Sequence, residues 1–99
     1  MALVQVSVVP VGTETPSFSS YVADACRVAA GDGVKYQVNP MATVLEGDLD
    51  RVLGVVRRMH RAAIDNGADR VITHISIDER QDKPLTIDGA VSSVTSSLH

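Results

Sequence analysis

The segment Tyr36–Asp48 constrains the fold most, because it predicts a hairpin of two short strands followed directly by a helix. Polar and apolar side chains alternate along its first half, as they do in a strand with one polar face. Pro40 interrupts this strand, since proline has no backbone N–H to pair. The extended pattern resumes from Met41 to Glu46, and Gly47 with Asp48 is typical of a helix start. We therefore expect a hairpin edged by the polar side chains of Asn39, Thr43 and Glu46.

The residues before the hairpin predict one strand and one helix. Alternation over residues 2–9 places three valines on one face of the first strand. Thr15 and Pro16 form the expected helix start, because threonine is a good N-cap and proline suits the first helical position. Apolar residues then recur at helical spacing from Phe18 to Ala29, and Gly31 ends the helix.

The residues after the hairpin predict a helix, a strand and a short terminal helix. Asp48 is the expected N-cap of the helix, which closes at Asn66 and Gly67. Its apolar stripe comprises Leu49, Val52, Leu53, Val56, His60 and Ala63. Residues Arg70–Arg80 predict the last strand, with one apolar and one mixed face. The tail from Thr86 to Leu98 has helical spacing of apolar residues but is rich in serine.

The order strand, helix, strand, strand, helix, strand predicts an α+β fold of the ferredoxin-like βαββαβ type, with an antiparallel sheet and two helices on one face. A chain of 99 residues supports one such domain, spanning residues 1–99. Right-handed crossovers place the first and third strands in the centre. The face without helices is half apolar, so we expect another subunit to cover it. On this open face we expect Leu3, Gln5, Ser7, Gln37, Ile72, His74 and Ser76.

Composition and missing motifs exclude several classes of function. The net charge of −3 and the scattered basic residues argue against nucleic acid as a partner. An RNA-recognition sheet would carry aromatic residues on its central strands, where we expect Gln5, Ser7, Thr43 and Leu45. Cys26 is the only cysteine, and no His or Cys spacing indicates a metal site. No segment reaches membrane-spanning length, and we expect a cytoplasmic location.

His60 is the sharpest anomaly, because a histidine falls on the apolar stripe of the second helix. It is either a buried histidine that hydrogen-bonds a backbone carbonyl or an imidazole presented to a pocket. Twelve residues beyond Asp48 span roughly 18 Å of helix, about the length of a five-residue strand. We therefore place His60 near the Asn39 to Met41 end of the hairpin.

Glu46 lies at the opposite end of the same strand, where the end of the last strand is also expected. Its carboxylate is either solvated, paired with Arg80, or available to a ligand cation or amino-heterocycle. Asp78 and Arg80 have the same alternatives. Asn39 and Thr43 offer hydrogen bonds to a ligand, although both residue types are ordinary near turns. The sequence thus predicts two polar clusters, one at each end of the sheet.

Several segments together carry a resemblance to a known family. They are Ser17–Val22, the run from Asn39 to Gly47, Met59-His60, Gly67–Val71, Ile77–Arg80 and the tail around Lys83-Pro84. In these segments the chain resembles the small thiamine-binding, YkoF-like family of ferredoxin-like proteins. The resemblance covers almost the whole chain. It implies a homodimer or homotetramer that binds thiamine or its hydroxymethylpyrimidine part without catalysis and without a cofactor.

The resemblance and the polar hairpin favour one function over two alternatives. The leading hypothesis is a thiamine or pyrimidine binder that draws its ligand contacts from Tyr36, Asn39, Met41, Thr43, Glu46, His60, Asp78 and Arg80. The aminopyrimidine needs a donor and acceptor edge with an apolar wall, and the thiazolium favours a carboxylate. The first alternative is a structural or regulatory homo-oligomer without a small-molecule ligand. A weaker alternative is an enzyme with His60 and Glu46 as acid and base, but their expected separation argues against it.

Overall fold

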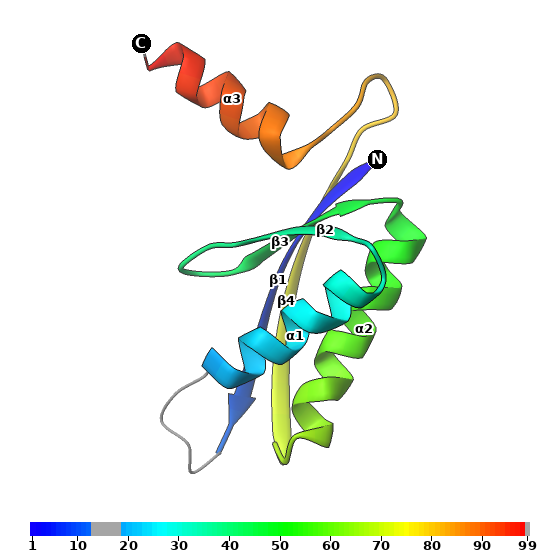
Figure 1. The fold of residues 1–99 in the computed structure, drawn as a ribbon, viewed down its shortest axis with the longest axis vertical. Coiled ribbons are helices and arrows are strands. Elements are labelled where there is room, and N and C mark those ends of the chain that lie inside the picture. The colour runs from blue at the N-terminus through cyan, green and yellow to red at the C-terminus, as the bar shows by residue number, and fades with distance from the viewer. Residues whose placement is uncertain (13–18, 99) are drawn as a thin grey trace.

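The computed structural model describes residues 1–12 and 19–98 of the chain (Figure 1). Its elements are β1 (Ala2–Val11), α1 (Ser19–Gly31), β2 (Lys35–Val38), β3 (Thr43–Gly47), α2 (Leu49–Asp65), β4 (Arg70–Glu79) and α3 (Ile87–Ser97). The expected helix start at Thr15 and Pro16 lies outside the described residues. The other predicted elements are present, with boundaries that differ from the expected ones by a few residues at most.

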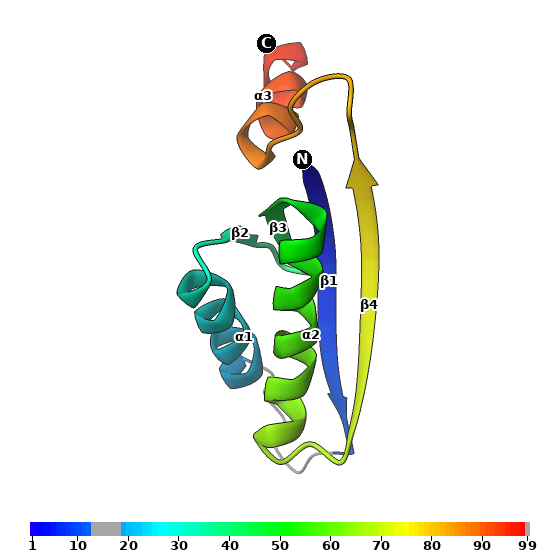
Figure 2. The ribbon, with the colours of Figure 1, turned by 90° about the vertical axis from the view of Figure 1, so that its right-hand side faces the viewer.

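The four strands form one antiparallel sheet in the order β2-β3-β1-β4. β1 and β3 are therefore central, as predicted, and α1 and α2 lie together on one face (Figure 2). This arrangement confirms the α+β, ferredoxin-like fold. β4 is the longer of the two edge strands, with 10 residues against 4 in β2.

The strand register decides which side chains face the helices. Val4 lies opposite Leu45, and Val6 lies opposite Thr43. All four side chains are buried beneath α1 and α2. Thr43 and Leu45 therefore face the helices and not the open face. The β3 residues on the open face are the alternate ones, Val44 and Glu46, because neighbouring strand residues point to opposite faces.

α2 is bounded by the residues that the sequence predicts. The Asp48 side chain accepts the backbone N–H of Arg51 at the N-cap, and Asn66 is the C-cap. Gly67 follows with a φ of 104°, a left-handed conformation that glycine adopts without a steric penalty. Both ends of this helix are therefore set by local side-chain and backbone chemistry.

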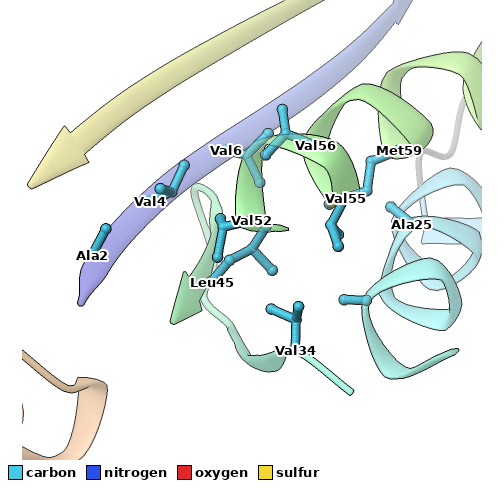
Figure 3. Packing of buried hydrophobic residues seen from close by; sticks show 11 residues of the cluster. Ala2, Val4, Val6, Ala25, Val34, Leu45, Val52, Val55, Val56 and Met59 are labelled. Carbon is cyan, nitrogen blue, oxygen red and sulfur yellow. The ribbon is translucent and has the colours of Figure 1, made fainter. Parts of the chain in front are cut away.

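The buried stripe of α2 is rotated relative to the predicted one. It comprises Val52, Val55, Val56, Met59 and Ala63. The sequence interpretation omitted Val55 and Met59, which lie on the side of α2 toward Ala25 of α1 (Figure 3). At about 100° per residue, His60 lies about 80° around the helix from Val52. α2 packs on α1 as well as on the sheet, so the stripe turns toward α1 and leaves Leu53 and His60 half-buried toward β4.

α3 lies beyond the end of the sheet, beside the N-terminus of β1 and apart from α1 and α2 (Figures 1 and 2). Thr86 is its N-cap and accepts the N–H of Gly89. Ile87 is buried against the body of the protein, whereas Val94 and Leu98 are 62% and 77% exposed. The terminal helix was predicted correctly, and its apolar stripe has no cover within the described chain.

In the described part of the chain, no helix combines the length and apolar character needed to cross a bilayer. The cytoplasmic location that we expected from the sequence stays a prediction.

Candidate functional site

A notch opens where the pairing between β1 and β3 stops. The register of these strands ends at Val6 opposite Thr43, while β1 continues to Val11. The hairpin tip turns away beyond this pair, and the Asn39 N–H donates to the Ala42 carbonyl oxygen at 3.0 Å across it. A hollow of about 510 Å³ lies between the tip, β1 and the two helices. This volume is in the range of small-molecule sites.

The walls of this hairpin cavity are mainly apolar. They are formed by Val6, Ser7, Val8, Val9, Ala25, Asn39, Pro40, Met41, Ala42, Thr43 and Met59. Thr43 is only 6% exposed and is the buried polar residue of the site. Met41 stands at the rim with 87% of its surface exposed. None of these described lining residues carries a charge, so the cavity suits a neutral ring better than an ion.

Backbone groups add polar contacts to the apolar cavity. Residues 7–9 of β1 have β4 on one side, but β3 does not reach them on the other. Their backbone N–H and C=O groups on the β3 side thus have no strand partner. Backbone groups of this kind are obligatory hydrogen-bonding groups. The unpaired edge thus offers both hydrogen-bond donors and acceptors to a bound molecule.

The Asn39 side chain is oriented by its neighbour on the strand. Its Oδ1 accepts a hydrogen bond from Gln37 Nε2 at 3.0 Å. Within the described part of the chain, the Asn39 side chain makes this one hydrogen bond, and it does so through its oxygen. The NH₂ group of Asn39 is therefore the part of the side chain that a ligand can engage as a donor.

A second hollow, of about 640 Å³, lies next to the first between α1 and β2. Tyr36 and Val38 form its β2 wall, and Cys26 belongs to its α1 wall. Asn39 lines both hollows. Of the predicted ligand residues, Asn39, Met41 and Thr43 thus line the hairpin cavity, whereas Tyr36 lines only the second hollow.

Cys26 of the second hollow lies close enough to Thr43 of the hairpin cavity for the Thr43 side chain to influence the pKa of its thiol. Burial raises the pKa of the Cys26 thiol above its ordinary value, and the Thr43 hydrogen bond partly offsets this shift. The thiol is half-buried. A group that is neutral near pH 7 fits the uncharged character of the site.

His60 is not part of the hairpin cavity. Its Nδ1 lies 2.6 Å from Thr73 Oγ1 on β4, and Thr73 lies opposite Val8 of β1. The predicted level along the sheet is therefore correct, but β4 and the hairpin lie on opposite sides of β1. Met59, the residue before it, faces the hairpin instead. The hydrogen-bond partner is also a side-chain hydroxyl and not the backbone carbonyl that we considered.

Glu46 has a structural partner at the far end of the sheet. Its Oε1 accepts the backbone N–H of Ile87 at 2.7 Å. Lys35, opposite Glu46 on β2, donates to Asp88 at 2.7 Å, and this hydrogen bond raises the pKa of the Lys35 ammonium. Both contacts fasten the first turn of α3 to the hairpin. Glu46 therefore lies away from the hairpin cavity and fixes α3.

Asp78 and Arg80 share the Glu46 end, as predicted, but they do not form one cluster with it. Asp78 is exposed on β4 and lies opposite Leu3, with Glu46 on the other side of that leucine. Arg80 binds Asp82 through two hydrogen bonds, of 2.9 Å and 2.6 Å. This contact lowers the pKa of the Asp82 carboxyl. The considered pairing of Arg80 with Glu46 is therefore not formed.

The positions of His60 and Glu46 argue against their use as an acid and base pair. Thr73, which contacts His60, lies opposite Val8 of β1, whereas Glu46 lies opposite Leu3. These two β1 residues are five positions apart, or about 17 Å along a strand. Glu46 also points to the open face, whereas Thr73 faces the helices. Among the described residues, no group of three His, Cys, Asp or Glu side chains has the geometry of a metal site.

The comparison with known protein families matches residues 4–95 to the family described as thiamine-binding protein. This chain belongs to the thiamine-binding protein family. The resemblance inferred from its sequence motifs is thereby confirmed.

Relatives that are similar to this family member over its full length come from different organisms. The UPF0045 protein YqgV of Bacillus subtilis is 42% identical over 102 residues, which cover 99% of this chain and 98% of that one. A UPF0045 protein of Methanothermobacter thermautotrophicus is 36% identical over 99 residues, covering 99% of this chain and all of the other.

Solved structures agree with the fold of this family member. A hypothetical protein of Methanocaldococcus jannaschii superposes with a TM-score of 0.86 at 37% identity, over 95% of each chain. A Thermotoga maritima protein provisionally assigned to thiamine biosynthesis or salvage has a TM-score of 0.77 at 26% identity, over 94% of this chain and 97% of that one.

Within this member of the thiamine-binding protein family, sequence reasoning missed several cavity residues. Met59 has a detectable signal, since it lies seven residues after Val52 on the same helical face. No sequence signal predicts that residues 7–9 of β1 line the cavity, because only the strand register shows where the pairing with β3 ends. The sequence does not single out Ala25 as a cavity residue either, because small apolar residues occur throughout α1.

Proposed function

We propose that this protein binds thiamine or its hydroxymethylpyrimidine part, without converting it, in the hairpin cavity. The observation that carries the proposal is the juxtaposition of a buried hydroxyl, that of Thr43, with the unpaired β1 backbone edge inside an apolar hollow. Family membership supports a thiamine-related ligand. The absence of charge among the described lining residues favours the aminopyrimidine ring as the buried portion of the ligand.

The ring enters the cavity with its polar edge toward β1. Thr43 and the Asn39 amide supply side-chain hydrogen bonds, while Val6 and Met59 pack against the faces of the ring. Met41 covers the ring from the rim. The thiazolium remains outside this cavity, because no described lining residue carries a charge and the predicted ligand carboxylate of Glu46 is engaged by Ile87 at the other end of the sheet.

Calorimetric titration tests this proposal, with thiamine and hydroxymethylpyrimidine as separate ligands. Both ligands should bind, with affinities within about tenfold of each other, because the shared pyrimidine makes the buried contacts. Absence of heat and of any thermal shift with either ligand at millimolar concentration would overturn the proposal. Binding of thiamine alone would show that the thiazolium carries recognition and would move the site away from the uncharged cavity.

We also propose that the protein is a homo-oligomer, either a dimer or a tetramer. The supporting observations are two separate sets of exposed apolar side chains, Val91, Val94 and Leu98 on α3 and Ile72 on the open sheet face. Apolar side chains grouped on one exposed helix face are typical of an interaction surface. If assembly were the whole function, substitutions at the hairpin cavity would leave every property except stability unchanged. Ligand titration and light scattering on the same samples separate the two functions.

A further inference from the structure

A third hollow lies between α2 and β4, on the other side of β1 from the hairpin. Its volume is about 400 Å³, and it shares no described lining residue with the hairpin cavity. Leu53 and Val56 of α2 and Ile75 of β4 form apolar walls, and Ile75 is 46% exposed. An apolar side chain of a strand is thus left open to solvent beside a helix that should cover it.

His60 is held in a fixed orientation in this α2–β4 groove. Its Nδ1 lies 2.6 Å from Thr73 Oγ1, and both residues line the groove. The Nε2 atom makes no hydrogen bond with another described residue. Because one nitrogen is occupied, the ring presents its second nitrogen at a defined position to any ligand in the groove.

Two arginines flank His60 on the rim of the groove. Arg57 and Arg61 are four residues apart on α2, so they lie on the same side of the helix. The ion pairs of the described residues involve Arg27, Lys35, Arg58 and Arg80, but neither Arg57 nor Arg61. Like charges at this spacing repel each other. An anion between the two guanidinium groups removes the repulsion and accepts charge-assisted hydrogen bonds.

We propose that the α2–β4 groove binds a small organic anion, in which a carboxylate or phosphate group is attached to an apolar body. Arg57 and Arg61 hold the anionic group, and His60 contributes a further polar contact. Leu53 and Ile75 receive the apolar body. The inference is independent of the proposed function, because the two cavities have different lining residues.

NMR titration of the full chain tests this proposal, with phenyl phosphate and benzoate as probes and with benzyl alcohol and inorganic phosphate as comparators. At least one of the aromatic anions should shift the His60 ring and Ile75 methyl resonances in a saturable manner. Benzyl alcohol lacks the charge and inorganic phosphate lacks the apolar body, so each should bind at least about tenfold more weakly.

Arg57→Gln and Arg61→Gln should each weaken binding of the aromatic anion by about tenfold. Both side chains are exposed, so the fold should be retained. Arg70→Gln is the matched control, because it removes one positive charge from an exposed residue outside the groove, and it should leave the affinity unchanged.

Three results would each overturn the proposal. One is the absence of any saturable shift at His60 and Ile75 with either aromatic anion. Another is an equal effect of all three arginine substitutions, which would indicate non-specific charge attraction. The last is protein-concentration dependence of the same resonances without binding of the probes, because a second copy of the chain would then occupy the groove.

Discussion

The carboxylate of Glu46 accepts a 2.7 Å hydrogen bond from the backbone N–H of Ile87, 41 residues later in the chain. This contact connects the end of β3 to the first turn of α3. A carboxylate at this position satisfies an N–H that has no partner within its own helix, and its charge is favourable at a helix N-terminus. It also gives Glu46 a structural role at the end of the sheet remote from the hairpin cavity.

Glu46→Ala should loosen α3 and leave ligand binding intact. We expect a loss of about 1–2 kcal/mol in the free energy that docks α3, since a hydrogen bond to a partly buried charged group is removed. Hydrogen exchange of the α3 amides measures this effect. Glu79→Ala is the control, because Glu79 is an exposed carboxylate on β4. If Glu46→Ala abolished ligand binding with unchanged α3 exchange, Glu46 would be a ligand residue instead.

The fold was predictable because its signals are local. Alternation, the Asp48 cap and the glycine after Asn66 each depend on a few neighbouring residues, and the element order then limits the topology. Glu46 illustrates what sequence cannot supply. Its residue type and its end of the sheet were predicted, but its partner is a backbone amide 41 residues away that no side-chain pattern reveals.

The candidate site was predicted in part for the same reason. Asn39 and Thr43 are close in sequence, so a hairpin brings them together whatever the rest of the fold does. His60 was placed at the right level but at the wrong edge, because helix rise fixes distance along an axis, whereas the rotation of α2 depends on its packing against α1. His60 lies beside the buried stripe of α2, and the sequence pattern alone did not distinguish this position from one within the stripe.

Thr43→Val should weaken binding of hydroxymethylpyrimidine by about tenfold, because the substitution removes the buried hydroxyl and keeps the side-chain shape. Calorimetry measures the affinity, and a denaturation curve checks that the fold is retained. Thr73→Val is the matched control, since Thr73 lies outside the hairpin cavity and its hydroxyl contacts His60. Equal effects of the two substitutions on affinity would contradict the assignment of the site.

Cys26 should report on occupancy of the hairpin cavity. Because burial raises the pKa of its thiol, the native protein holds less thiolate at pH 8 than an unfolded chain does. Alkylation by iodoacetamide should therefore be slower in the native state, and the rate should recover as pH rises through the raised pKa. A pyrimidine ligand bound beside Thr43 should slow the reaction further. Mass spectrometry follows the modification, with the urea-unfolded chain as the control.

Unprotected alkylation of Cys26 in the presence of saturating ligand would contradict this prediction. So would native reactivity equal to that of the unfolded chain across the pH range. The measurement is unambiguous because Cys26 is the only cysteine in the sequence.

The apolar stripe of α3 should mediate self-association. Val94→Lys places a charge on the exposed stripe, and we expect it to shift the particle mass toward the 10.5 kDa of one chain. Ser96→Lys adds the same charge on a face separated from Val94 by about 160° around the helix and should have no such effect. Light scattering after size-exclusion chromatography measures the mass. A monomeric wild-type protein, or equal effects of both substitutions, would contradict the proposed role of α3.

A crystal structure of the protein with bound hydroxymethylpyrimidine tests the central claim most directly. The account predicts the pyrimidine ring between Val6, Thr43 and Met59, with its polar edge toward the backbone of residues 7–9. The ligand in the α2–β4 groove, on the open sheet face or beside Glu46, with the hairpin cavity empty, would contradict it.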